Sequence, residues 1–128
     1  MTSVSTRADE GSRDASEVVR HPAVGYPRAM IRHVVLFRWK PEIPAGQVER
    51  ITAALSALPA RIPEIAAYSC GPNLGIAANW HYGIAADFAT IDDYRVYDVH
   101  ADHEAARAGT VRPWIAERAV AQFELAPI

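Results

Sequence analysis

The sequence predicts one α+β domain whose elements follow the order β-α-β-β-α-β. The chain has 128 residues and half of them are hydrophobic, which is enough material for one core. Four runs are rich in β-branched and aromatic residues, as strands are. Two stretches with helix signals separate the first strand from the second and the third strand from the fourth.

Composition excludes several classes of protein. A net charge of −2 without a basic cluster argues against a nucleic-acid partner. The single cysteine, Cys70, excludes a disulfide framework and a cysteine-based zinc site. No apolar run reaches membrane-spanning length and no signal-peptide apolar region is present, so we expect a cytoplasmic protein with no membrane partner.

Residues 1–29 differ from the rest of the chain. They combine acidic residues and arginines with Ser, Thr, Gly and Pro, and they show no apolar period. Such a segment cannot bury enough apolar surface to fold alone. We therefore expect a flexible tail over residues 1–29 and a folded domain over residues 30–128.

The first strand is predicted over residues 31–39. Alternation places Ile31, His33, Val35 and Phe37 on one face, yet both faces carry apolar residues, so the strand is expected to be covered on both sides. The next element is a helix bounded by prolines, and Thr90 is the predicted N-cap of the second helix. The remaining expected elements are a helix at 45–58, strands at 65–70 and 80–88, a helix after Thr90 that Gly109 interrupts, a short turn from Pro113, and a strand at 119–125.

This order is that of the ferredoxin-like split β-α-β arrangement, with one antiparallel four-stranded sheet and two helices on one of its faces. The other face would be bare in a monomer. We assign Ile31, Val35 and Phe37 to that uncovered face. A partner sheet is the simplest cover for it, so a homodimer is expected.

The stretch Y-D-V-H-A-D-H, residues 97–103, gathers the most proton-transfer chemistry in the chain. If it is helical, Tyr97, His100 and His103 share one broad stripe. A phenol and two imidazoles on one side of a helix can exchange protons near neutral pH, because histidine titrates at roughly 6.5.

Several motifs together resemble the stress-responsive A/B barrel (Dabb) family. They are I-R-H-V-V-L-F-R-W-K, A-A-D-F-x-T-I-D-D-Y, H-A-D-H, V-x-P and V-A-Q-F-E-L, in that order from Met30 to Leu125. The resemblance implies a dimeric α/β barrel, in which two four-stranded sheets close across a homodimer. Many members are known only as stress-associated proteins, whereas a plant polyketide cyclase of the family closes a ring by aldol chemistry without a metal or an organic cofactor.

The resemblance also implies a site. His103 takes the position of the family's catalytic histidine and Tyr97 that of its catalytic tyrosine, as general base and hydrogen-bond donor. His33 matches the histidine of the first strand, while Tyr82 stands where the cyclase has a second barrel histidine. Candidate substrate-binding residues are His33, Tyr82, Phe37 and His100.

Other interpretations of these residues remain open. His33 is also typical of a buried core histidine with a satisfied ring, and the aromatic residues are also typical of core packing. His100 and His103 with Asp98 or Asp102 resemble a metal pair, but the spacing fixes no third ligand, so no metal and no cofactor are predicted.

Two functions of different class therefore follow from the sequence. The first is a cofactor-independent, cyclase-like or lyase-like enzyme that moves protons on a small apolar or aromatic carbonyl ligand. The second is a non-catalytic stress-associated dimer whose barrel binds a small molecule or nothing. A cofactor-free monooxygenase on the same fold is a third and more distant alternative.

Overall fold

The computed structural model describes residues 25–77 and 79–128. Most of the predicted tail therefore lies outside the described residues. The chain divides into two units, of which the larger is residues 31–124. In the smaller unit, the Ile128 amide donates to the carbonyl of Tyr26 at 2.9 Å. The site lies wholly in the larger unit.

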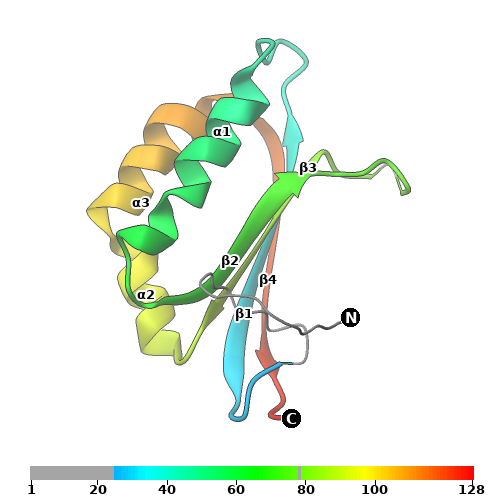
Figure 1. Ribbon diagram of the computed structural model, residues 1–128. Helices are drawn as coiled ribbons and strands as arrows, with labels where there is room; N and C mark the ends of the chain where they lie inside the picture. Colours follow the sequence, from blue (N-terminus) through cyan, green and yellow to red (C-terminus); the bar gives the residue numbers. More distant parts are fainter. Residues whose placement is uncertain (1–24, 78) are drawn as a thin grey trace, which may run out of the picture. The chain divides into compact units, whose positions relative to one another are not determined.

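The core of the larger unit is a four-stranded antiparallel sheet with strand order β2-β3-β1-β4 (Figure 1). The central strands β1 and β3 pair so that Val35 faces Ile84 and Phe37 faces Tyr82. The strand bounds are β1 (Met30–Trp39), β2 (Ile65–Pro72), β3 (Tyr82–Phe88) and β4 (Ile115–Leu125).

All the helices of this unit lie on one side of the sheet (Figure 1). The Thr90 hydroxyl accepts a hydrogen bond from the Asp93 amide at 3.1 Å, which confirms the predicted N-cap. None of the helices in the described part of the chain is long and apolar enough to cross a membrane. The helix bounds are α1 (Gln47–Ser56), α2 (Ile91–Val99) and α3 (Ala101–Ala106), with a π-helix η3 (Arg107–Val111) and 3₁₀ turns η2 (Leu58–Ala60) and η4 (Arg112–Trp114).

The helices bury one face of the sheet, which we call the inner face; on β1 it consists of His33, Val35 and Phe37. Val35 and Phe37 are each only 5% exposed and belong to the same core cluster as Ile51 and Leu55 of α1. The inner face therefore faces the protein's own helices, not a partner.

The prediction that Ile31, Val35 and Phe37 form the uncovered face was wrong. The outer face of β1, on the other side of the sheet, carries Arg32, Val34, Leu36 and Arg38 instead. Both faces of this strand are apolar in part, so alternation separates the two sets but does not say which set meets the helices.

Ion pairs hold the two outer-face arginines. The Arg32 guanidinium binds both carboxylate oxygens of Asp87, at 2.7 and 2.9 Å, and Asp87 is only 2% exposed. Arg38 pairs with Glu117 of β4 at 2.5 Å. These cross-strand pairs allow arginine on a half-buried sheet face.

Three local predictions need correction. The second helix is not continuous, because the backbone at His100 is extended (φ −65°, ψ 139°) and separates α2 from α3. Gly109 does not interrupt the helical path but lies within η3. Strand β4 begins at Ile115, before the predicted start at residue 119.

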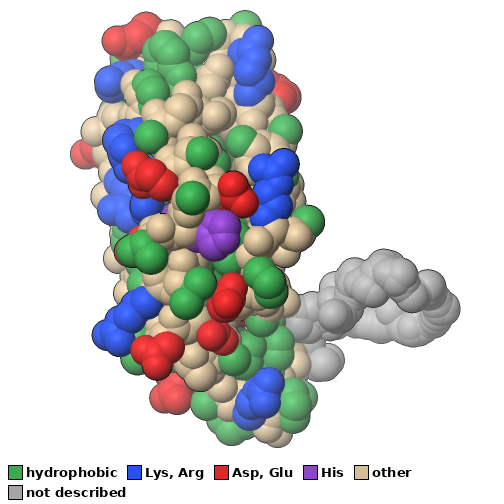
Figure 2. Space-filling view, turned by 90° about the vertical axis from the view of Figure 1, so that its left-hand side faces the viewer, with side chains coloured by type: hydrophobic (Ala, Val, Ile, Leu, Met, Phe, Trp, Pro, Cys, Tyr) green, Lys and Arg blue, Asp and Glu red, His purple; other side chains and the backbone are tan. Residues whose placement is uncertain are grey.

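On the face formed by the helices, acidic and basic side chains alternate with apolar ones (Figure 2). No large patch of one charge sign covers this face. The surface is typical of a solvated helix layer, in agreement with the small net charge.

Candidate functional site

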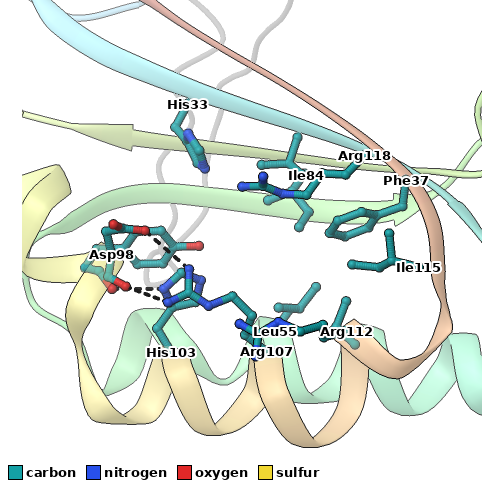
Figure 3. Close-up of a pocket in the computed structure, with 13 residues that line it drawn as sticks. His33, Phe37, Leu55, Ile84, Asp98, His103, Arg107, Arg112, Ile115 and Arg118 are labelled. Carbon is teal, nitrogen blue, oxygen red and sulfur yellow. Dashed lines mark hydrogen bonds and ion pairs between the residues drawn. The ribbon is translucent and has the colours of Figure 1, made fainter.

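A cavity of about 380 Å³ lies between the helices and the inner face of the sheet (Figure 3). Its volume is in the range of small-molecule sites. Apolar side chains form much of its wall: Val35, Phe37, Leu55, Ile84, Val111 and Ile115. Its polar lining consists of His33, Tyr97, Asp98, His103, Arg107, Arg112 and Arg118.

His103 is held in this cavity by the break between α2 and α3. A helix that ends leaves its last carbonyl groups without helical partners. The Tyr97 carbonyl near the end of α2 accepts the His100 amide at 3.2 Å, and His103 Nδ1 also lies 3.0 Å from it. Because a carbonyl oxygen only accepts, the ring proton is on Nδ1 and the Nε2 lone pair of the neutral imidazole is free to accept a proton.

Tyr97 packs directly on this imidazole. The two rings are stacked with their centroids 4.0 Å apart and their planes 20° apart. Burial is the main cause that raises the pKa of Tyr97 to about 12, partly offset by a hydrogen-bonding interaction with Tyr68. The phenol is therefore protonated at neutral pH and can donate a hydrogen bond.

The pKa of His103 lies below its ordinary value. Burial is the largest cause, and the positive charge of Arg107 adds to it, while hydrogen bonds to the carbonyls of Tyr97 and Asp98 oppose it. A neutral imidazole at pH 7 follows, which is the state that a general base requires.

His33 faces the same cavity from β1. Its ring is 4% exposed, and Gln122 of β4 donates from its amide nitrogen to His33 Nδ1 at 2.8 Å. Burial, followed by the charge of Arg118, lowers the pKa of His33 to about 4. With Nδ1 accepting from the amide, the ring proton is on Nε2, which is a donor.

His100 does not line the cavity. Its Nδ1 accepts a hydrogen bond from the Asp102 amide at 3.1 Å and thereby caps α3. The side chain is 29% exposed. The predicted common stripe of Tyr97, His100 and His103 is thus wrong, although the break brings Tyr97 and His103 together by another route.

Phe37 lines the cavity, but Tyr82 does not. The Tyr82 ring packs against Phe37 and Trp39, and its hydroxyl lies 2.6 Å from Thr52 Oγ1 of α1. With 1% of its surface exposed, Tyr82 is placed as a core residue next to the site.

Sequence reasoning missed the charged residues of the cavity. Arg107 links the two helices on either side of the break. Its guanidinium donates to the Asp98 carbonyl at 2.9 Å and to the Asp98 carboxylate at 3.3 Å in α2, and to Glu104 at 2.8 Å in α3. The spacing from residue 98 to 107 corresponds to no simple helical contact. No local pattern in the sequence signalled them.

The described residues contain no group of three or more His, Cys, Asp or Glu side chains arranged to hold a metal ion. His100 lies 4.0 Å from Asp102 as a possible charged pair, and His103 faces the cavity instead. The pair considered as metal ligands in the sequence therefore does not converge.

The sheet order and the helices on one face define a ferredoxin-like α+β fold. Within that class, the family Stress responsive A/B Barrel Domain (Dabb) matches residues 31–125, and the chain belongs to this family. None of the curated proteins compared with the sequence matched it.

Solved structures with the same fold are of several kinds. A dimeric ferredoxin-like protein of unknown function from Thermobifida fusca is 41% identical, with 80% of this chain and 96% of that chain covered and a TM-score of 0.71. A dimeric protein of unknown function from Bacteroides fragilis is 27% identical, with coverage of 75% and 96% and a TM-score of 0.68. The hydroxynitrile lyase of Passiflora edulis is 20% identical, with coverage of 77% and 94% and a TM-score of 0.67, a likeness of fold alone.

Proposed function

We propose that this protein is a cofactor-independent enzyme that transfers protons next to the carbonyl of a small, largely apolar substrate, in an aldol-type ring closure like that of the family's polyketide cyclases. One observation carries the proposal. His103 presents its Nε2 lone pair to a cavity with a largely apolar wall, while its other ring nitrogen is fixed on a backbone carbonyl.

The reaction needs a base and a donor at one place. His103 Nε2 takes a proton from a carbon next to one carbonyl, and the resulting carbanion attacks the carbon of a second carbonyl in the same molecule. The Tyr97 hydroxyl gives its proton to the alkoxide that forms. The imidazolium then releases its proton to solvent and the phenolate takes a proton from solvent, which restores both groups.

The apolar wall supports this chemistry. A cavity lined by Val35, Phe37, Ile84 and other apolar side chains favours a folded, apolar substrate chain. His33, with its proton on Nε2, is placed to donate to a substrate oxygen across the cavity from His103.

The proposal is tested with phenylacetone, whose acidic C–H bonds lie between a ring and a carbonyl. In deuterated buffer, proton NMR follows the exchange of these hydrogens. The enzyme should accelerate exchange well above the rate with an equal concentration of His103→Ala protein. Equal rates for the two proteins would refute proton transfer and leave the alternative, a non-catalytic barrel that binds a small molecule.

We also propose that the chain forms a homodimer through the outer face of the sheet. Related structures from Thermobifida fusca and Bacteroides fragilis are described as dimeric. In this chain Val34 and Leu36 lie half-buried on the outer face, and Phe123 is 49% exposed. Glu117 meets Arg38 on the outer face, and alternation along β4 places Phe123 on that same face. An apolar sheet face of this kind favours a partner.

A further inference from the structure

The side chain of Arg118 extends from β4 into the cavity, beside His33 and above the helix that carries His103 (Figure 3). An arginine on an edge strand would ordinarily turn its head to water. Arg118 is exposed as a residue, yet its side chain also lines the cavity, together with Ile84 and Phe37 (Figure 3).

Among the residues that the structure describes, Arg118 differs from Arg107 and Arg112 in having no acidic partner. Arg107 is bound by Asp98 and Glu104, and Arg112 lies 3.5 Å from Glu104. Within residues 25–77 and 79–128, no carboxylate lies within ion-pair distance of the Arg118 guanidinium. Within this part of the chain, no carboxylate therefore neutralises the charge of Arg118.

The cavity as a whole carries excess positive charge. Its lining includes three arginines and a single carboxylate, that of Asp98. Burial lowers the pKa of His33 and the charge of Arg118 adds to this effect, so both disfavour a second proton on the ring. A bound anion would relieve this excess, and a neutral ligand would not.

We propose that Arg118 binds a carboxylate of the substrate, so that the ligand is an organic acid with an apolar body. The guanidinium fork matches the two oxygens of a carboxylate. With the acid group held at β4, the apolar body lies along Phe37 and Ile84 and the reacting carbonyl is directed to His103 and Tyr97. The reaction assigned to this ligand rests on the proposed function. The negative charge assigned to the ligand rests on Arg118 alone.

Phenylacetate and phenylacetamide test the charge directly, because they have the same size and shape and differ in one negative charge. Binding is followed by calorimetry and by the NMR signals of the His33 and His103 rings. The wild-type protein should bind phenylacetate roughly tenfold more tightly than the amide, as expected for one charge-assisted pair at a partly solvated site. The preference should weaken as salt is added.

Arg118→Gln should abolish the preference, and Arg118→Lys should retain part of it, because lysine keeps the charge but not the fork. Arg38→Gln is the matched control, since Arg38 lies on the outer face in a pair with Glu117. A preference for the acid that survives in Arg118→Gln, or equal binding of both probes by the wild type, or no binding of either, would overturn the proposal.

The test separates this inference from the proposed chemistry. His103→Ala should keep the preference for phenylacetate, because the carboxylate site does not need the base. Accelerated exchange of phenylacetone with no preference for the acid would refute the carboxylate site alone. A preference for the acid without accelerated exchange would refute the enzyme alone.

Discussion

On β1, both faces of the sheet carry apolar side chains, but the charged side chains that the structure describes are paired on one face and not on the other. On the outer face, Arg32 and Arg38 are each matched by a carboxylate on a neighbouring strand. On the inner face, His33 is kept neutral and Arg118 is unmatched among the described residues. The outer face thus pairs its charges, whereas the inner face carries an arginine that no described carboxylate compensates, as the proposed ligand site requires.

The same contrast appears in the depth of burial. Val35 and Phe37 of the inner face are almost fully buried by the helices, but Val34 and Leu36 of the outer face are only half-buried. Substitutions on the inner face should therefore affect chemistry and stability. Substitutions on the outer face should affect assembly.

The largest expected effect is that of His103→Ala on turnover. Without the imidazole no group is placed to take the proton, and loss of a general base lowers rates by about a thousandfold. The rate of hydrogen exchange of phenylacetone measures this change. The molecular mass of the protein assembly in solution should be the same for the variant and the wild type. His100→Asn is the control, because asparagine also caps a helix and His100 lies outside the cavity. An equal loss in both variants would show that the helix break, not the base, matters.

Tyr97→Phe should reduce the same rate by about a hundredfold, because it removes one donor to the developing oxyanion. The ring stack and the carbonyl that holds His103 remain, so binding of phenylacetate should change little. Tyr82→Phe loses a comparable hydroxyl outside the cavity and should leave the rate unaltered. A rate that falls in Tyr82→Phe but not in Tyr97→Phe would remove Tyr97 from the mechanism.

Acid should destabilise the inner face. His33 has a pKa of about 4 when folded and 6.5 as its ordinary value, so the unfolded chain binds more protons between these limits. The free energy of unfolding should then be highest above pH 6.5 and fall by roughly 2 kcal/mol as the pH drops towards 4. Denaturant melts across this range measure the slope. His33→Gln should flatten it, and an unchanged slope would exclude His33 as its source.

Leu36→Glu should weaken the proposed dimer by at least about tenfold, since symmetry places two new charges at one interface. Sedimentation equilibrium measures the change in mass. Ala105→Glu puts the same charge on the exposed side of α3 and should not alter the mass. If the Leu36→Glu variant remains a dimer, the dimer interface does not lie on the outer face.

The smallest effect is expected from the tail. Deleting residues 1–29, predicted to be flexible, should leave the thermal midpoint of unfolding nearly unchanged. Deleting residues 1–24 is the comparison, because it retains the hydrogen bond between Tyr26 and Ile128. A drop of several degrees in both variants would mean that the tail packs on the domain.

Much of the fold could be predicted because its signals are local. Strand alternation, the prolines around α1 and the Thr90 cap each act within a few residues, and the structure agrees with them. The helix break was not predictable in this way. No proline or glycine marks it, and the imidazole of His100 supplies the cap, a use of histidine that propensity does not reveal.

The arginine in the cavity was hidden for a different reason. Ile115 and Arg118 both line the cavity although they are three residues apart, and a regular strand would place them on opposite faces. The beginning of β4 departs from that alternation. The departure lies at Ile115, because Glu117 on the outer face and Gln122 beside His33 put Arg118 on the inner face by regular alternation. Alternation alone did not say which face of β4 meets the helices.

The hydrogen bond between His103 and the carbonyl of residue 97 has an evolutionary consequence. Enzymes often orient a histidine with an aspartate, and one substitution can then remove the orienting group. Here the acceptor is a main-chain oxygen, which every amino acid at position 97 would supply. A change of side chain at position 97 therefore alters the hydrogen-bond donor or the shape of the site. It leaves the tautomer of His103 unchanged, because the backbone oxygen that fixes this tautomer remains.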